Sequence, residues 1–153
     1  MRSGRLMVRG TAFGAALLVA LVGWTSMSGA FAVIHGVSFS GPAASATVTV
    51  TGSSFGTAPK GTPDTACGPS TGVGDTYGAN LFFVDNTHNW EAGYKGTTDY
   101  NCLGIIIQSW STTKAVLKFG KGFGTGGWIM HNGDHFAVAL NGWMYGGTVS
   151  GLS

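Results

Sequence analysis

The sequence predicts an all-β fold of two packed sheets. In residues 47–51 valines alternate with threonines, a period of two that is typical of a strand with one buried and one solvated face. Leucine, alanine, glutamate and lysine do not recur at the 3.6-residue spacing of an amphipathic helix, and 27 glycines are spread along the chain. Asn141-Gly142, between two apolar segments, is the preferred two-residue hairpin turn.

The first nine residues contain all three arginines of the chain. An apolar run over residues 12–22 follows, and then the small-residue sequence Ala30-Phe31-Ala32. A basic start, an apolar run too short to cross a bilayer and an A-x-A-like site are the features of a secretory signal peptide. We therefore expect a signal peptide over 1–32, cleaved after Ala32, and a secreted, extracellular single domain over 33–153.

The first expected strand covers residues 33–39, with Val33, Val37 and Phe39 on one face and Ile34 on the other. A proline at position 42 ends it, because proline has no N–H to continue a ladder. The second strand is the Val/Thr segment 47–51, after which Gly52-Ser53-Ser54 turns the chain.

The second half of the chain predicts the remaining strands. Residues 80–84 are short and strongly apolar, and the β-branched run that opens 105–110 predicts a strand buried on both faces. Residues 114–119 alternate, with the lysines on the face opposite Ala115, Leu117 and Phe119. A hairpin over 136–145 completes the set.

About seven strands without a helix favour an immunoglobulin-like β-sandwich, with a small β-barrel as the alternative. Two long loop insertions interrupt the expected strands. Residues 57–78 are rich in threonine, proline, glycine and aspartate, and residues 85–101 are polar and aromatic.

The chain contains two cysteines, Cys67 and Cys102. In a secreted chain such a pair predicts one disulfide, which here would tie the first insertion to the body of the domain. A pair without CxxC spacing is a poor set of metal ligands, so we expect no metal at these thiols.

The charge of residues 33–153 excludes some partners. Five lysines stand against five aspartates and Glu91, without a basic cluster. Nucleic acids and anionic membranes are bound by clustered basic residues, so we expect neither as a partner. No second apolar stretch near ~20 residues follows the leader, so we expect no membrane span after signal cleavage.

Several segments resemble IPT/TIG (immunoglobulin-like, plexin, transcription factor) domains of the secreted bacterial type. Residues 47–56, TVTVTGSSFG, resemble the family's "TVTGSGFG"-like strand and turn, and they follow the first strand as in that family. Residues 110–116, WSTTKAV, resemble its "WS-x-T-x-I" step, and residues 134–149 resemble its final hairpin. The resemblance implies an immunoglobulin-like fold and a non-catalytic module that binds, spaces or presents; the two insertions and the cysteine pair depart from the family pattern.

The second insertion carries the densest set of candidate ligand-binding residues: Asp85, Asn86, Trp90, Glu91, Tyr94 and Tyr100. Its three aromatic rings offer flat faces on which sugar rings can stack. Its oxygen donors would suit a hard cation such as Ca²⁺. The alternative interpretation is that Trp90 covers the core beneath a long loop.

Two further chemistries have candidate residues. Glu91 with Asp85 or Asp99 could supply the two carboxylates of a glycosidase, provided that they face one cleft. His131 and His135 flank a turn and could approach each other as metal ligands, although a polar hairpin tip is the simpler interpretation. We therefore predict no bound metal and no cofactor.

The sequence thus favours a secreted, non-catalytic binding or surface-interaction module, with an extracellular polysaccharide as the favoured ligand and a surface protein as the other partner. The first alternative is a self-assembling extracellular structural protein whose edge strands pair between copies. The second alternative is a small secreted hydrolase that uses Glu91.

Overall fold

The structure is a computed structural model of the 153-residue chain, and it describes residues 31–64, 73–94, 103–125 and 127–153. Within these ranges there are ten strands and two short 3₁₀ turns, and no α-helix. In chain order the elements are β1 (Val33–Ser40), η1 (Ala43–Ser45), β2 (Thr47–Ser53), β3 (Thr62–Pro63), β4 (Asp75–Thr76), η2 (Gly78–Asn80), β5 (Leu81–Asp85), β6 (Trp90–Ala92), β7 (Ile105–Trp110), β8 (Lys114–Phe119), β9 (His135–Leu140) and β10 (Trp143–Thr148).

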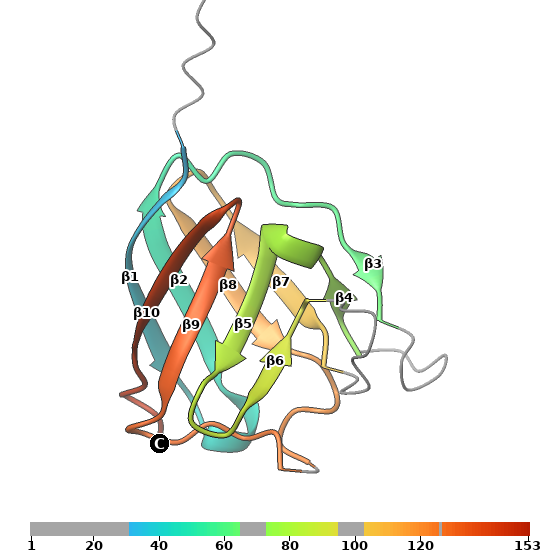
Figure 1. Cartoon of the computed structure of the whole chain (residues 1–153), viewed down its shortest axis with the longest axis vertical. Helices are drawn as coiled ribbons and strands as arrows, with labels where there is room; N and C mark the ends of the chain where they lie inside the picture. The colour runs from blue at the N-terminus through green and yellow to red at the C-terminus, as the bar shows by residue number, and fades with distance from the viewer. Residues whose placement is uncertain (1–30, 65–72, 95–102, 126) are drawn as a thin grey trace, which may run out of the picture.

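The strands form two antiparallel sheets that pack face to face (Figure 1). The larger sheet has six strands in the order β1-β2-β8-β7-β4-β3, and the smaller has four in the order β10-β9-β5-β6. The predicted all-β sandwich is therefore confirmed. The chain changes sheet several times, so that strands far apart in sequence, such as β2 and β8, become neighbours.

The core lies between the two sheets. Val48 and Val50 of β2 project into it from the larger sheet, and Leu81 and Phe83 of β5 from the smaller one. A cluster of buried aromatic rings fills its centre, with Phe83 stacked on Phe136 at a centroid distance of 5.7 Å. Large aromatic side chains contribute much of the buried apolar area in a domain of this size.

Two predictions of strand faces are corrected by the structure. A register shift between Ile34 and Gly36 in β1 allows Ile34 and Phe39 to be buried together, although their numbers differ in parity. In β7 only Ile105 is fully buried, while Ile106 is exposed. The β-branched run is therefore not buried on both faces, because the outer face of the larger sheet is open to solvent at Ile106.

Both predicted insertions contain short strands. β3 and β4 pair within the first, and β6 pairs with β5 in the second, with Phe83 opposite Ala92 and Asp85 opposite Trp90. The sequence predicted no strand over Trp90–Ala92, because three residues are too few to show a period of two.

The predicted hairpin between β9 and β10 is present, and Asn141 and Gly142 both have positive φ, 47° and 84°. The predicted disulfide partners Cys67 and Cys102 lie outside the described residues, as do Tyr100, Asp99 and residues 1–30 of the expected signal peptide. Among the described residues, no helix is both long and apolar enough to cross a membrane.

Candidate functional site

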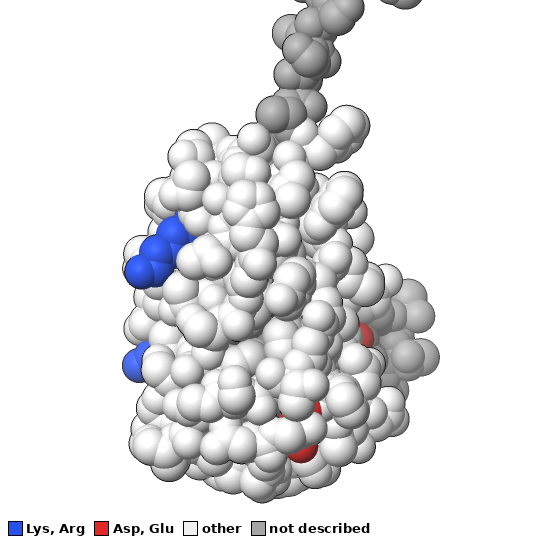
Figure 2. All heavy atoms as spheres, turned by 90° about the vertical axis from the view of Figure 1, so that its left-hand side faces the viewer, with Lys and Arg blue, Asp and Glu red and all other residues white. Residues whose placement is uncertain are grey.

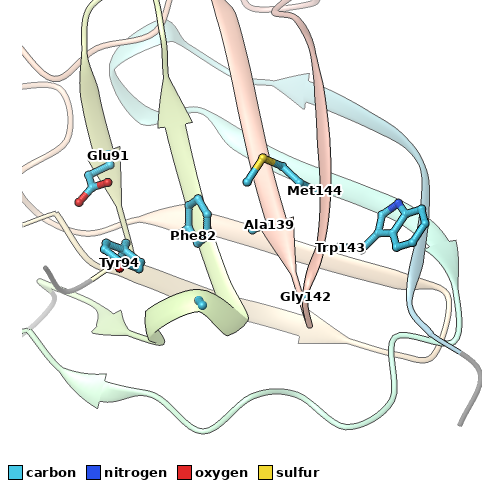
Figure 3. Close-up of a pocket in the computed structure, with 8 residues that line it drawn as sticks. Phe82, Glu91, Tyr94, Ala139, Gly142, Trp143 and Met144 are labelled. Atoms are coloured by element: carbon cyan, nitrogen blue, oxygen red, sulfur yellow. The ribbon is translucent and has the colours of Figure 1, made fainter.

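Aromatic and apolar side chains line a pocket on the outer face of the smaller sheet, which we call the outer-face pocket (Figure 3). Its volume is about 470 Å³. Its lining residues are Ala79, Phe82, Glu91, Tyr94, Ala139, Gly142, Trp143 and Met144.

The register of the smaller sheet places these residues together. Strand alternation turns Phe82 outward from β5, while its neighbours Leu81 and Phe83 point into the core. Phe82 lies opposite Ala139 of β9, which lies opposite Met144 of β10, so the three form one row across the sheet. Residues from three strands thus meet on one face.

The pocket is hollow at its centre because the residue there, Ala139, has a small side chain. Ala139 separates Phe82 and Tyr94 on one side from Met144 and Trp143 on the other (Figure 3). Tyr94 is 39 % exposed and Met144 is 62 % exposed. The ring of Tyr94 packs against that of Phe82 in an edge-to-face arrangement, with centroids 5.4 Å apart, which holds the ring in place.

Gly93 directs the chain from β6 to Tyr94. Its φ is +80°, and a Cβ there would lie 2.7 Å from Cδ1 of Ile105. Its N–H donates to the carbonyl of Leu103, and its carbonyl accepts from the N–H of Tyr77. The backbone that precedes Tyr94 is therefore fixed by hydrogen bonds to Leu103 and to Tyr77.

Trp90 does not belong to this pocket. It is 5 % exposed, stacks on Phe83 and meets Phe119 edge to face. Its indole N–H is buried without a hydrogen-bond partner among the described residues. Its ring is therefore not available for stacking on a sugar. Trp90 packs in the core, as the alternative interpretation of the sequence expected.

The predicted oxygen donors of the second insertion do not converge on one point. Asp85 is fully buried, and its Oδ1 accepts hydrogen bonds from the backbone N–H groups of Thr87 and His88. Glu91 lies opposite Val84 in the register, on the outer face, whereas Asp85 lies on the inner face. Asp85 and Glu91 thus neither share a calcium site with Asn86 nor face one cleft as a glycosidase pair would.

A second group of polar residues lies at the opposite end of the smaller sheet, where β5 ends and β9 begins. Nδ1 of His88 lies 3.3 Å from Oδ2 of Asp134, and Nδ1 of His131 lies 3.5 Å from the same oxygen. We call His88, His131 and Asp134 the histidine cluster. The sequence paired His131 with His135, but the structure brings His88 to His131 instead, and His135 is not part of the cluster.

Sequence reasoning missed His88 because the contact depends on strand register alone. Asp85 lies opposite Phe136, which places the turn after β5 beside the start of β9. No spacing along the chain indicates this.

Tyr77 is a buried titratable residue between the sheets. Burial, and to a smaller extent the negative charge of Asp75, raises the pKa of Tyr77 to about 12. Its hydroxyl donates to the carbonyl of Ile105 at 3.4 Å. Tyr77 therefore stays protonated at neutral pH and is a structural residue.

Comparison of the chain with family models, with curated proteins and with solved structures gives no match.

Proposed function

We propose that this protein is a non-catalytic binding module that holds a carbohydrate in the outer-face pocket. The observation that carries the proposal is the exposure of Tyr94, Trp143 and Met144 around a pocket floored by Ala139. A volume of about 470 Å³ lies within the range of small-molecule sites, and such sites combine apolar walls with a few polar groups.

The chemistry of the pocket suits a sugar. The rings of Tyr94 and Phe82 present aromatic surface to the C–H groups of a pyranose, and the tyrosine hydroxyl adds a polar group. Glu91 brings carboxylate oxygens to the same rim, and these can accept hydrogen bonds from sugar hydroxyls. An apolar surface next to hydrogen-bonding groups matches the two kinds of surface that a sugar presents.

The low content of charged residues, 9 % of the chain, supports an uncharged ligand. Figure 2 shows the side of the molecule where β1 and β10 lie, and only a few basic and acidic side chains interrupt it. A strongly charged polymer would need a complementary patch of one sign. A neutral polysaccharide does not.

The proposal includes secretion and an IPT/TIG-type domain. The segment 47–56 that resembles the family forms β2 and the turn after it, in which Ser54 and Gly56 have positive φ and Phe55 is fully buried. The left-handed backbone at Gly56 favours glycine, and the buried site at Phe55 favours a large apolar side chain. These are the two residue types that end the TGSSFG segment on which the resemblance rests. A secreted module with a sugar-binding face would attach itself to an extracellular polysaccharide.

The test is retention of the purified protein on insoluble polysaccharides, namely cellulose, chitin, xylan and peptidoglycan, with titration of the matching soluble oligosaccharide. We expect Tyr94→Ala to weaken binding about fivefold or more, because a stacked ring contributes about 1 kcal/mol beyond its buried area. The matched control is Ile106→Ala, which truncates an exposed apolar side chain on the other sheet and should leave binding unchanged.

Retention on none of the polymers, or equal losses in the two variants, would contradict the proposal. The same samples should be run by size-exclusion chromatography at several concentrations. β10 is an edge strand without a charged residue, and Trp143 and Met144 are exposed on it, which is the feature that favours self-assembly as the second candidate function. A mass that rises with concentration, without retention, would support that second candidate.

A further inference from the structure

The histidine cluster joins two separate loops at the end of the sandwich away from the outer-face pocket. His88 belongs to the turn between β5 and β6, and His131 and Asp134 belong to the segment that leads into β9 (Figure 1). The two rings lie 5.2 Å apart between centroids. One potential ligand atom from each of the three residues lies within 4.8 Å of the other two.

Two of the three separations between these atoms match the edges of a metal coordination sphere, and the third is within 4.8 Å. Four ligands at the usual zinc distances of about 2.0–2.1 Å, placed tetrahedrally, lie about 3.3 Å from one another. The two nitrogen–oxygen distances to Asp134 are 3.3 Å and 3.5 Å. Charge-assisted hydrogen bonds between such groups are shorter, about 2.7–2.9 Å, so direct pairing alone does not account for the spacing.

Backbone hydrogen bonds hold the first loop in place. The N–H of Asn86 donates to the carbonyl of His135, and the N–H of His135 donates to Oγ1 of Thr87. Within the loop, Oδ1 of Asp85 accepts from the N–H of His88 at 2.9 Å. The turn that carries His88 is therefore attached to the start of β9.

The second loop is attached to the C-terminal segment. The N–H of Gly133 donates to the carbonyl of Val149, and the side chain of Asn132 exchanges two hydrogen bonds with the backbone of Leu152. Oδ2 of Asp134 accepts from the N–H of His131 at 2.6 Å. Because both loops are held by other parts of the fold, an ion would find its ligands nearly in position.

The electrostatics of this end favour a cation. Asp85 and Asp134 are both buried, and Nδ1 of His88 lies 3.4 Å from Oδ2 of Asp85 as well as near Asp134. In the described part of the chain, the basic side chains that contact these two carboxylates are His88 and His131, with neither lysine nor arginine among them. Buried carboxylates are costly unless they are paired or coordinate a metal.

We infer that His88, His131 and Asp134 bind one divalent transition-metal ion of the Zn²⁺ type, through the two Nδ1 atoms and the carboxylate. Imidazole nitrogen selects zinc and its neighbours over Ca²⁺ and Mg²⁺, which prefer oxygen ligands. Both histidine rings are exposed, so the ion can enter from solvent and a water molecule can complete the coordination. Asp85 is a positioning residue, because its Oδ1 accepts from the backbone N–H of His88 and thereby fixes the turn that carries the ring.

The test is a calorimetric titration of the purified, EDTA-treated protein with Zn²⁺, alongside absorption spectra of the Co²⁺-loaded protein. We expect one Zn²⁺ per chain and the visible d–d bands of tetrahedral Co²⁺. His88→Gln and His131→Gln should each weaken binding at least tenfold, since loss even of an outer-shell partner typically costs 10–100-fold. Imidazole ¹⁵N shifts on Zn²⁺ addition should identify Nδ1 as the ligand atom.

The matched control is His135→Gln, which removes a neighbouring exposed imidazole outside the cluster. It should leave the affinity for Zn²⁺ unchanged. Absence of stoichiometric binding, equal affinity in wild type and both cluster variants, or an equal loss in His135→Gln would each overturn the inference. Because both cluster histidines are exposed, their replacement should not prevent folding, and the circular dichroism spectrum provides an independent measure of the intact domain.

Discussion

At the scale of single residues, strand alternation decides which side chains reach a ligand. Trp90 and Glu91 are neighbours in β6, yet Trp90 packs in the core and Glu91 lies at the outer-face pocket. Alternation alone would place Trp90 and Tyr94 on one face, because they are four residues apart. β6 ends at Ala92, however, and the chain turns at Gly93, so Tyr94 reaches the outer-face pocket while Trp90 stays in the core.

Trp90→Ala should therefore affect stability and leave the binding surface in place. Removing a buried tryptophan that contacts Phe83 and Phe119 should lower the free energy of unfolding by about 3–5 kcal/mol. Urea denaturation followed by circular dichroism measures this. The matched control, Tyr94→Ala, should cost about 1 kcal/mol or less, and a Trp90 variant that loses sugar binding at unchanged stability would contradict the assignment.

At the scale of elements, the connection that leaves β6 determines how Tyr94 meets Phe82. At position 93 glycine is the residue type that this connection accepts without strain. The positive φ disfavours any residue with a Cβ, and a Cβ there would also contact the side chain of Ile105 too closely. The turn between β5 and β6 has a comparable role at the other end, where it brings His88 to β9. Both candidate sites depend on the β5–β6 hairpin.

Gly93→Ala should destabilise the domain more than Gly56→Ala does. Both glycines have positive φ, which costs about 1–2 kcal/mol for an alanine. A Cβ at Gly56 meets no atom within 4 Å, whereas one at Gly93 would lie 2.7 Å from Cδ1 of Ile105. Urea denaturation of the two variants measures the difference, and equal losses would show that the close contact has no effect.

At the scale of the whole molecule, the two sheets are held together by an almost entirely apolar interface, and Tyr77 is one of its few titratable members. Its raised pKa means that the folded protein retains a proton that the unfolded chain releases above about pH 10. The contribution of Tyr77 to stability is therefore complete below pH 10.

We expect the contribution of Tyr77 to the free energy of unfolding to fall as pH rises from 10 to about 12. Tyr77→Phe removes this ionisation and one weak hydrogen bond to Ile105, so the variant should be somewhat less stable at pH 9 and lose less stability above pH 10. Chemical denaturation of both proteins across this pH range provides the comparison. Parallel curves would show that Tyr77 titrates alike in the folded and unfolded states.

The sequence by itself determined the all-β class, the main strands and the β9–β10 hairpin. These follow from local properties of the chain. Valine alternates with threonine in β2, lysine alternates with apolar residues in β8, and the Asn141-Gly142 pair accepts positive φ. It also named Tyr94 and Glu91 as candidate ligand residues, both of which line the outer-face pocket.

Only the tertiary structure decided which residues share a site. Trp143 and Met144 join Tyr94, and His88 joins His131, through the register of β5, β9 and β10, which pairs segments about fifty residues apart. The burial of Trp90 and the β1 irregularity that turns Ile34 inward depend on the register with the neighbouring strand of the chain and on packing against the opposite sheet. Periodicity shows that a strand has two faces, but which face meets the core depends on the strands that pack around it.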